Sequence, residues 1–462
     1  MPALRVGTPA PDGLQPARED DRDEGVWSVL PTACLCVGLA LSVFSGYWPN
    51  IGSPIPLDRI CFLGGFILLG LGLDGWVGWR RWRWRRVYGV MAATAAYASF
   101  SALITRSLTT SEGFFALLDR LGLVPFLLVL VAPVAFGTRR QRDLLLATLV
   151  FVGVYLGVTA IGEGLSIKAL VHPSYISDPH VGIHYGRARG PFAEAVADGL
   201  GLYFCAVASA IAAYQWRRLW ARAIAGAVCL MCLVGTVFTL TRAVWVGVAL
   251  ATVIGMLCEP RLRRWLLAVI PLGALTVLFL LVAVPHLSTK ATSRLDAEKP
   301  VWDRLNTDLA ALRMVEERPF QGWGWQRFLH SDTKFLRQSA NYPLTGSKAE
   351  VHNVFLSHLV ELGLVGTALW LWAFWLAIVS PMLRRGPPDI EPWRVGLIAV
   401  TVMWLLAAMF GPVPYAFPNA LIWLWGGVVM VGLEQRVPAQ ASTTAPARRS
   451  VSGLASQAGL IG

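Results

Sequence analysis

The sequence predicts an all-α polytopic membrane protein with about 12 transmembrane helices, and three observations lead to this fold class. The chain of 462 residues is 55% hydrophobic and only 15% charged, whereas about a quarter of the residues of a soluble domain are charged. Its mean hydropathy is +0.55. Apolar runs of roughly 20 residues, the length that crosses a bilayer, follow one another along most of the chain.

The apolar runs define an expected transmembrane bundle over residues 26–436, flanked by two tails. Residues 1–25 are polar and contain proline, and residues 437–462 are rich in Ala, Ser and Thr, so we expect both segments to be disordered. The twelve runs lie at about residues 26–48, 58–78, 88–105, 117–137, 144–162, 195–215, 223–241, 243–258, 265–285, 353–380, 394–411 and 419–435.

The net charge of +12 indicates membrane topology and not nucleic-acid binding. The Arg residues form short clusters between the apolar runs, and Lys and Arg accumulate in cytoplasmic loops of membrane proteins. If both termini are cytoplasmic, every second loop is basic, from residues 80–86 to the loop that contains Arg384 and Arg385. An error of one span would break this alternation, so the charge pattern supports the count of twelve.

Two loops on the opposite, extracytoplasmic side are long, at about residues 163–194 and 286–351. The second, between the ninth and tenth spans, is too long for a simple connection. Apolar residues at helical spacing over residues 301–315 predict an amphipathic helix that lies on the membrane face. Such loops above a helical bundle are where we expect the functional site.

His352 is the first candidate for a catalytic residue. It stands where the second long loop meets an apolar helix of membrane length. A neutral imidazole can accept a proton from a hydroxyl group near pH 7. By position alone, a helix-capping or interface histidine is the alternative. His180 and His184 have helix-face metal spacing, but their segment contains Pro and Gly, so we expect no metal site there.

Arginines at the outer ends of two spans are candidates for anion binding. Arg187 and Arg189 precede Gly190 at the start of a span, and planar guanidinium groups match phosphate oxygens. Arg242 lies between two apolar runs that are joined by almost no loop, which places it at the outer membrane edge. A cation there is costly without a partner or a function. Contact with lipid headgroups is the alternative for all three.

Together these segments resemble the bacterial O-antigen ligase and polymerase superfamily. The resemblance extends over about residues 140–435, with the motifs in the family order. R-x-x-G is matched at residues 187–190, T-x-[ST]-R at 239–242, P-x-x-G-x-G-x-x-x-F at 319–328, and H-N-x-x-L-x-x-L-x-E-x-G-x-x-G at 352–366. Two positions depart from the pattern: Glu194-Ala195 replaces a frequent Pro-Asn, and Val351 replaces a Pro before the His-Asn pair.

The resemblance implies a GT-C-like, metal-independent inverting glycosyltransferase in the bacterial cytoplasmic (inner) membrane, with no cofactor. The implied donor is a lipid-linked oligo- or polysaccharide on undecaprenyl diphosphate, and the acceptor is a hydroxyl of a glycan or lipid-glycan at the outer face. Arg187 and Arg242, with Arg189, are implied to bind the diphosphate. His352 is implied to activate the acceptor, with Asn353 and Arg304 as supporting residues.

Two questions stay open at this point. Ligases and polymerases share these motifs, so the product is either a ligated or a lengthened chain. The second hypothesis is a transporter or flippase of a lipid-linked glycan, which would use the same basic groove without covalent chemistry.

Overall fold

The computed structural model describes residues 26–71, 85–284, 287–295, 299–337 and 350–434, and every regular element in these ranges is helical. The longer helices are α1 (Val26–Leu41), α2 (Leu57–Leu71), α3 (Arg85–Ile104), α5 (Leu123–Ala135), α6 (Arg139–Gly164), α7 (Ala195–Gln215), α8 (Leu219–Phe238), α9 (Arg242–Cys258), α11 (Leu266–Ala283), α13 (Lys299–Glu317), α15 (Val354–Phe374), α17 (Glu391–Phe410) and α18 (Ala416–Glu434). The shorter ones are α4 (Ser111–Ala116), α10 (Pro260–Arg263), α12 (Leu287–Leu295), α14 (Phe328–Ser331) and α16 (Ser380–Met382).

The all-α membrane fold is confirmed. Within the described residues, nine helices or continuous helix pairs are long and apolar enough to cross a membrane, and α1 and α9 are shorter apolar helices. Each of the twelve expected runs overlaps a helix. The count of twelve and the GT-C relation stay predictions, and both expected tails lie outside the described residues.

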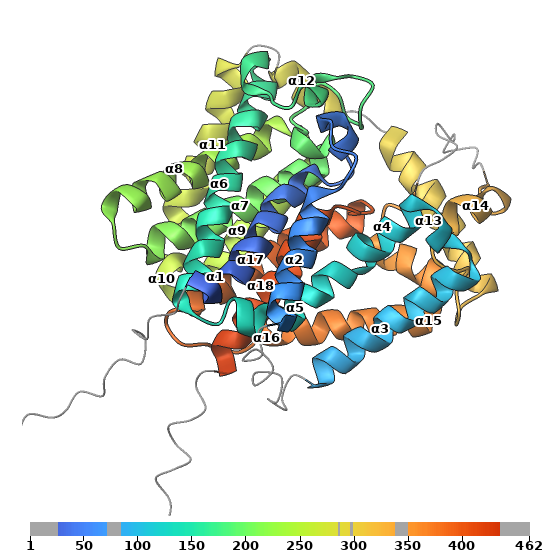
Figure 1. Cartoon of the computed structure of the whole chain (residues 1–462). Helices are drawn as coiled ribbons and strands as arrows, with labels where there is room; N and C mark the ends of the chain where they lie inside the picture. The colour runs from blue at the N-terminus through green and yellow to red at the C-terminus, as the bar shows by residue number, and fades with distance from the viewer. Residues whose placement is uncertain (1–25, 72–84, 285–286, 296–298, 338–349, 435–462) are drawn as a thin grey trace, which may run out of the picture.

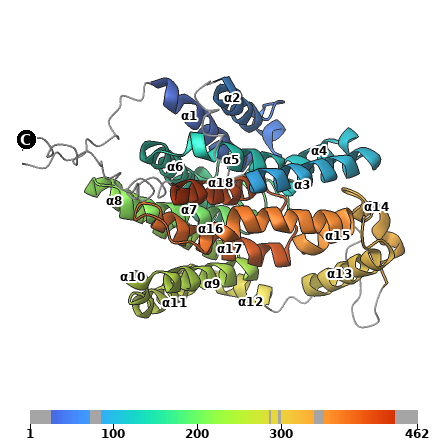
Figure 2. The ribbon, with the colours of Figure 1, turned by 90° about the horizontal axis from the view of Figure 1, so that it is seen from below.

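The helix α7 lies at the centre of the bundle because its small side chains let neighbouring helices approach. It packs against α6, α8 and α17, while α18 packs against α5, and the outlying α11 has no buried residue (Figures 1 and 2). At Gly199 an added Cβ atom would lie 2.5 Å from a methyl carbon of Val244 on α9. Small residues at such crossings are typical of membrane bundles, where packing replaces the hydrophobic effect.

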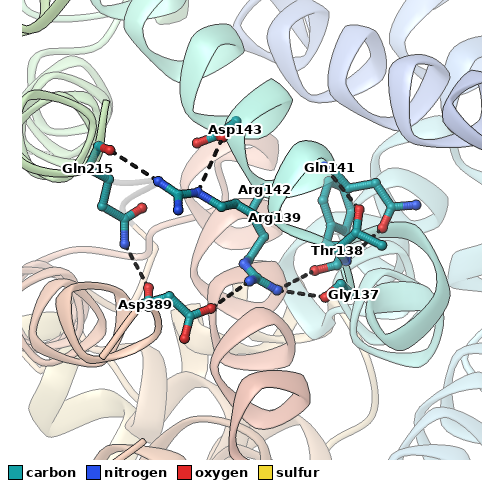
Figure 3. A network of polar contacts seen from close by, with 9 residues as sticks. Gly137, Thr138, Arg139, Gln141, Arg142, Asp143, Gln215 and Asp389 are labelled. Atoms are coloured by element: carbon teal, nitrogen blue, oxygen red, sulfur yellow. Dashed lines mark hydrogen bonds and ion pairs between the residues drawn. The ribbon is translucent and has the colours of Figure 1, made fainter. Parts of the chain in front are cut away.

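One end of the bundle gathers three of the loops that the charge pattern assigns to the cytoplasm (Figure 3). Arg142 lies 2.8 Å from Asp389 and donates to the carbonyl of Gly137 at 2.7 Å. Gln215, the last residue of α7, donates to the carbonyl of Asp389 at 2.7 Å and accepts from Arg139 at 3.3 Å. These alternate loops therefore share one end, as predicted, and the side of the membrane stays a prediction.

The amphipathic helix expected in the second long loop is present as α13. It lies with α14 at one end of the molecule and packs against α15 (Figure 2). Ala310 and Met314 are buried on its inner face. The apolar residues that suggested the helix are 42–47% exposed on its outer face: Val301, Leu305, Leu309 and Leu312. A membrane surface would bury this apolar face. The orientation of α13 on the membrane stays a prediction.

The tenth expected span is interrupted, which the sequence did not predict. In α15 the backbone of Gly363 leaves the helical region, with φ 65° and ψ −173°. The Gly/Trp turn of residues 319–324 lies against this break. Its Trp323 and Gly324 N–H groups donate to the carbonyls of Val360 and Glu361, at 2.8 and 2.9 Å. Backbone groups that the break frees are thus paired within the protein, as a low-dielectric environment demands.

This contact explains why two motifs far apart in the sequence both contain glycine. A Cβ atom on Gly363 would lie 2.2 Å from the carbonyl oxygen of Phe320, and one on Gly322 would lie 2.5 Å from the Gly363 nitrogen. The φ angles of both glycines are also positive, 65° at Gly363 and 70° at Gly322. Only glycine satisfies both conditions.

Beside the break lies a buried polar cluster. Glu361 is 3.8 Å from Arg120, which also donates to the hydroxyl of Ser357. His358 is fully buried, and its ring centroid lies 4.9 Å from that of Trp370. His358 and Glu361 therefore lie inside the bundle, where Glu361 pairs with an arginine of another segment.

Candidate active site

His352 is fixed at the start of α15 by the residue that follows it. The side-chain oxygen of Asn353 accepts from the backbone N–H of Leu356 at 3.1 Å, so Asn353 is the N-cap of the helix. Asparagine is among the best residues for this position, because its side chain satisfies a helical N–H group that otherwise lacks a partner. The His-Asn pair thus places an imidazole directly before a capped helix.

The contacts of the His352 ring favour a neutral imidazole that can accept a proton. Its Nδ1 atom lies 2.8 Å from the carbonyl oxygen of Glu350. A carbonyl oxygen only accepts, so Nδ1 carries the proton and Nε2 keeps its lone pair in the neutral ring. Burial lowers the pKa of His352, and the Arg304 cation lowers it further, against weaker opposing effects from Glu350 and Asp303.

The helix α13 contributes a hydrogen-bond acceptor to the main chain of His352 and a cation that acts on its ring. Asp308 accepts a hydrogen bond from the backbone N–H of His352, and Arg304 stands four residues before it on the same helix face. Burial raises the pKa of Asp308, while Arg304 and this hydrogen bond lower it. Residues about 45 positions apart in the chain, by their numbering, therefore meet through the packing of α13 on α15.

Arg242 is a second cation that acts electrostatically on Arg304. It is the first residue of α9, after the short break at residues 239–241, and its side chain is exposed. Burial lowers the pKa of Arg304, and repulsion from Arg242 lowers it further, whereas Asp308 and Glu194 raise it. Arg304 therefore lies within electrostatic range of the Arg242 cation, and an anion bound near both groups would be stabilised by both charges.

The sequence of this region matches a known family. A family model described as O-antigen ligase matches residues 227–371. This part of the chain is similar to O-antigen ligases, and we call it the O-antigen ligase domain. It contains Arg242, Arg304, the Gly/Trp turn and His352, and it confirms the superfamily resemblance drawn from the motifs. No curated protein matches the chain.

Arg187 lies outside the matched O-antigen ligase residues but beside them. The backbone N–H of its neighbour Ala188 donates to the carbonyl of Phe238, the last residue of α8, at 2.9 Å. Arg187 lines a small pocket with Leu240 and with Lys290 of α12. It therefore stands next to the α8–α9 connection that leads to Arg242.

Arg189 occupies a different environment from the one that the resemblance implies. Its side chain is fully buried, and its guanidinium donates to the carbonyls of three residues of the first long loop, Ile176, Asp178 and Val181. Its backbone N–H donates to Glu163 at 3.0 Å. Arg189 thus holds the loop together beside the O-antigen ligase domain, and its donors face protein carbonyls instead of a ligand.

The sequence did not predict a histidine–carboxylate pair, His184 and Glu194, whose carboxylate acts electrostatically on Arg304 of this domain. Glu194 is the N-cap of α7, and its Oε1 atom lies 3.0 Å from Nδ1 of His184. Burial raises the pKa of Glu194, but hydrogen bonds and charge from His184, with hydrogen bonds from Tyr415 and the Ala197 N–H, lower it more, so the carboxylate is ionised at neutral pH. An acidic residue before an apolar run signals the N-cap, while nothing in the sequence signals its partner.

Proposed function

We propose that the protein transfers a glycan from an undecaprenyl-diphosphate-linked donor to an acceptor hydroxyl at the outer face of a bacterial cytoplasmic membrane. The O-antigen ligase domain supports glycan transfer in a multi-pass membrane protein. The observation that supports the rest is that His352 lies within electrostatic range of the Arg304 cation, which itself lies within electrostatic range of Arg242. Base and anion site are the two parts that such a transfer needs.

In the proposed reaction, Nε2 of His352 takes the proton of the acceptor hydroxyl as its oxygen forms a bond to the anomeric carbon. The bond from that carbon to the diphosphate oxygen breaks on the opposite face, and its electron pair leaves with the diphosphate. Attack from the side opposite the leaving group inverts the anomeric centre. General-base catalysis of this kind typically contributes 10²–10⁴-fold.

The leaving diphosphate gains negative charge as the bond breaks, and in this proposal Arg242 and Arg304 stabilise it. Preorganised cations in a partly dry site stabilise a developing charge more than water does. Arg187, beside the same helix connection, adds a third guanidinium to the donor side. Asn353 supports His352 as a helix cap, and Arg189, occupied by carbonyls, is omitted from the diphosphate site.

Reconstitution of the purified protein in liposomes tests this function. With extracted lipid-linked donor and acceptor glycan added on both sides, we expect chain transfer together with release of the carrier diphosphate. A flippase would move the donor across the bilayer and leave its glycosidic bond intact. Translocation without diphosphate release would therefore reject the enzyme and favour the transporter.

The glycans of a deletion strain separate the two enzyme types. Accumulation of unextended single repeats on the carrier or acceptor would identify a polymerase. Accumulation of long chains on the carrier would identify a ligase. Complementation with the wild-type chain should restore the normal glycan in either case.

The pKa of His352 leads to a prediction for the pH dependence of kcat/KM, which reports groups of the free enzyme. Because burial and Arg304 lower this pKa, the acid limb should lie below the usual imidazole value of about 6.5. The base is active when neutral, so activity should be lost as pH falls through the lowered value. Arg304→Gln should shift the limb to higher pH, and an unshifted limb would assign it to another group.

A further inference from the structure

The pair formed by His184 and Glu194 is not used by the reaction described above. His184 precedes α7 by about ten residues, and its backbone is held with φ 63°, which is uncommon for a residue other than glycine. The next residue before it, Ile183, donates to the carbonyl of Ala193 at 2.9 Å. This contact brings the loop against the N-cap of α7 and sets the imidazole beside the Glu194 carboxylate.

The two ring nitrogens of His184 differ in their surroundings, because Nδ1 faces the Glu194 carboxylate and Nε2 does not. Nδ1 lies 3.0 Å from Glu194 Oε1, and the side chain is 33% exposed, whereas that of Glu194 is 7% exposed. Nε2 of His184 has no hydrogen-bond partner among the residues that the structure describes. A carboxylate that binds one ring nitrogen fixes the orientation of the other. Nε2 then accepts a hydrogen bond in the neutral ring and donates one in the protonated ring.

The pair belongs to the same end of the protein as His352. The Glu194 carboxylate acts electrostatically on Arg304, which in turn acts on His352. Tyr415, which precedes α18, donates a hydrogen bond to Glu194, and the Glu350 carboxylate also acts on it electrostatically. The backbone carbonyl of Glu350 contacts the His352 ring. Glu194, the partner of His184, and His352 therefore both lie within electrostatic range of Arg304.

We propose that His184, oriented by Glu194, binds a hydroxyl group of the acceptor glycan. This inference rests on the proposed function and names a residue for its acceptor side. A hydroxyl of a sugar can pair with Nε2 in either protonation state of the ring, so His184 holds the acceptor while His352 takes the proton.

Kinetics with separate variation of donor and acceptor test the role of His184. His184→Ala should raise KM for the acceptor glycan about tenfold, the effect of one lost hydrogen bond of about 1.4 kcal/mol. The donor KM should stay unchanged and kcat should change less than about threefold. His180→Ala is the matched control, because His180 is exposed in the same loop, four residues away, and should leave all constants unchanged.

A second variant shows whether the pair acts as a unit. Glu194→Gln keeps an oxygen that can cap α7 but removes the charge that orients the ring. The double variant with His184→Ala should be no worse in acceptor KM than His184→Ala alone. Additive losses would show that the two residues act independently and not as a pair. A lowered thermal unfolding midpoint of His184→Ala with an unchanged acceptor KM would show that the pair only ties the loop to α7.

Chemical protection tests glycan binding without catalysis. The acceptor glycan of the liposome assay carries no diphosphate and therefore probes the acceptor side. It should slow carbethoxylation of His184 by diethyl pyrocarbonate at least threefold, measured by peptide mass spectrometry, without protecting His180. Protection without any transfer by the wild type would reject the proposed function but keep this site. Transfer without protection of His184 would overturn the site alone.

Discussion

Replacing His352 with alanine is expected to reduce kcat for glycan transfer by about 10²–10⁴-fold, the usual contribution of a general base. The donor KM should change little, because Arg242 and Arg304 remain in place on the donor side. The measurement is the initial rate of carrier diphosphate release in liposomes, with donor varied at saturating acceptor. This split between kcat and donor KM follows from a proton transfer that occurs only in the transition state.

A matched variant separates chemistry from structure in this experiment. His330 lies on α14 in the same outer loop and is exposed, so His330→Ala should transfer glycan at the wild-type rate. Because the His352 ring also binds the Glu350 carbonyl, the thermal unfolding midpoint of His352→Ala must be compared with that of the wild type. If the midpoint is unchanged and transfer continues at more than a tenth of the wild-type rate, His352 is not the base.

The helices could be predicted from the sequence because lipid imposes a length on each span. Apolar runs identified α7 at residues 195–215 with both ends correct, and α13 was recognised by its helical spacing. The break in α15 could not be found in this way. It depends on N–H donors from the turn at residues 319–324, and hydropathy carries no information on such a distant partner.

The same limit separates the candidate residues that could be predicted from those that could not. Charge and hydropathy do not distinguish Arg187 from Arg189, since both precede one Gly-Pro turn. Their difference arises from the path of the first long loop, whose carbonyls surround Arg189. The proximity of Arg304 to His352 follows from the packing of α13 on α15, and the pairing of His184 with Glu194 from a local loop contact.

The guanidinium pair leads to the second large effect. Arg304→Gln should lower kcat by about 10²–10³-fold, the loss found when one preorganised group that stabilises developing negative charge is removed. It should also raise the donor KM, because the ground-state diphosphate already carries charge.

Arg242→Lys keeps the charge but loses the planar fork that matches phosphate oxygens, and we expect at least a tenfold loss of kcat/KM for the donor. Initial rates of diphosphate release at varied donor measure both.

Arg217→Gln is the control for these changes of charge, because Arg217 is exposed beyond the C-terminal end of α7, at the other end of the bundle. It should leave donor kinetics unchanged. If Arg242→Lys and Arg217→Gln are equally active, Arg242 only contacts headgroups at the membrane edge. If Arg304→Gln lowers transfer but leaves the donor KM and the acid limb unchanged, Arg304 supports α13 and does not face the diphosphate. The change in donor KM or in kcat/KM for the donor thus distinguishes Arg242 and Arg304 from arginines with a structural role only.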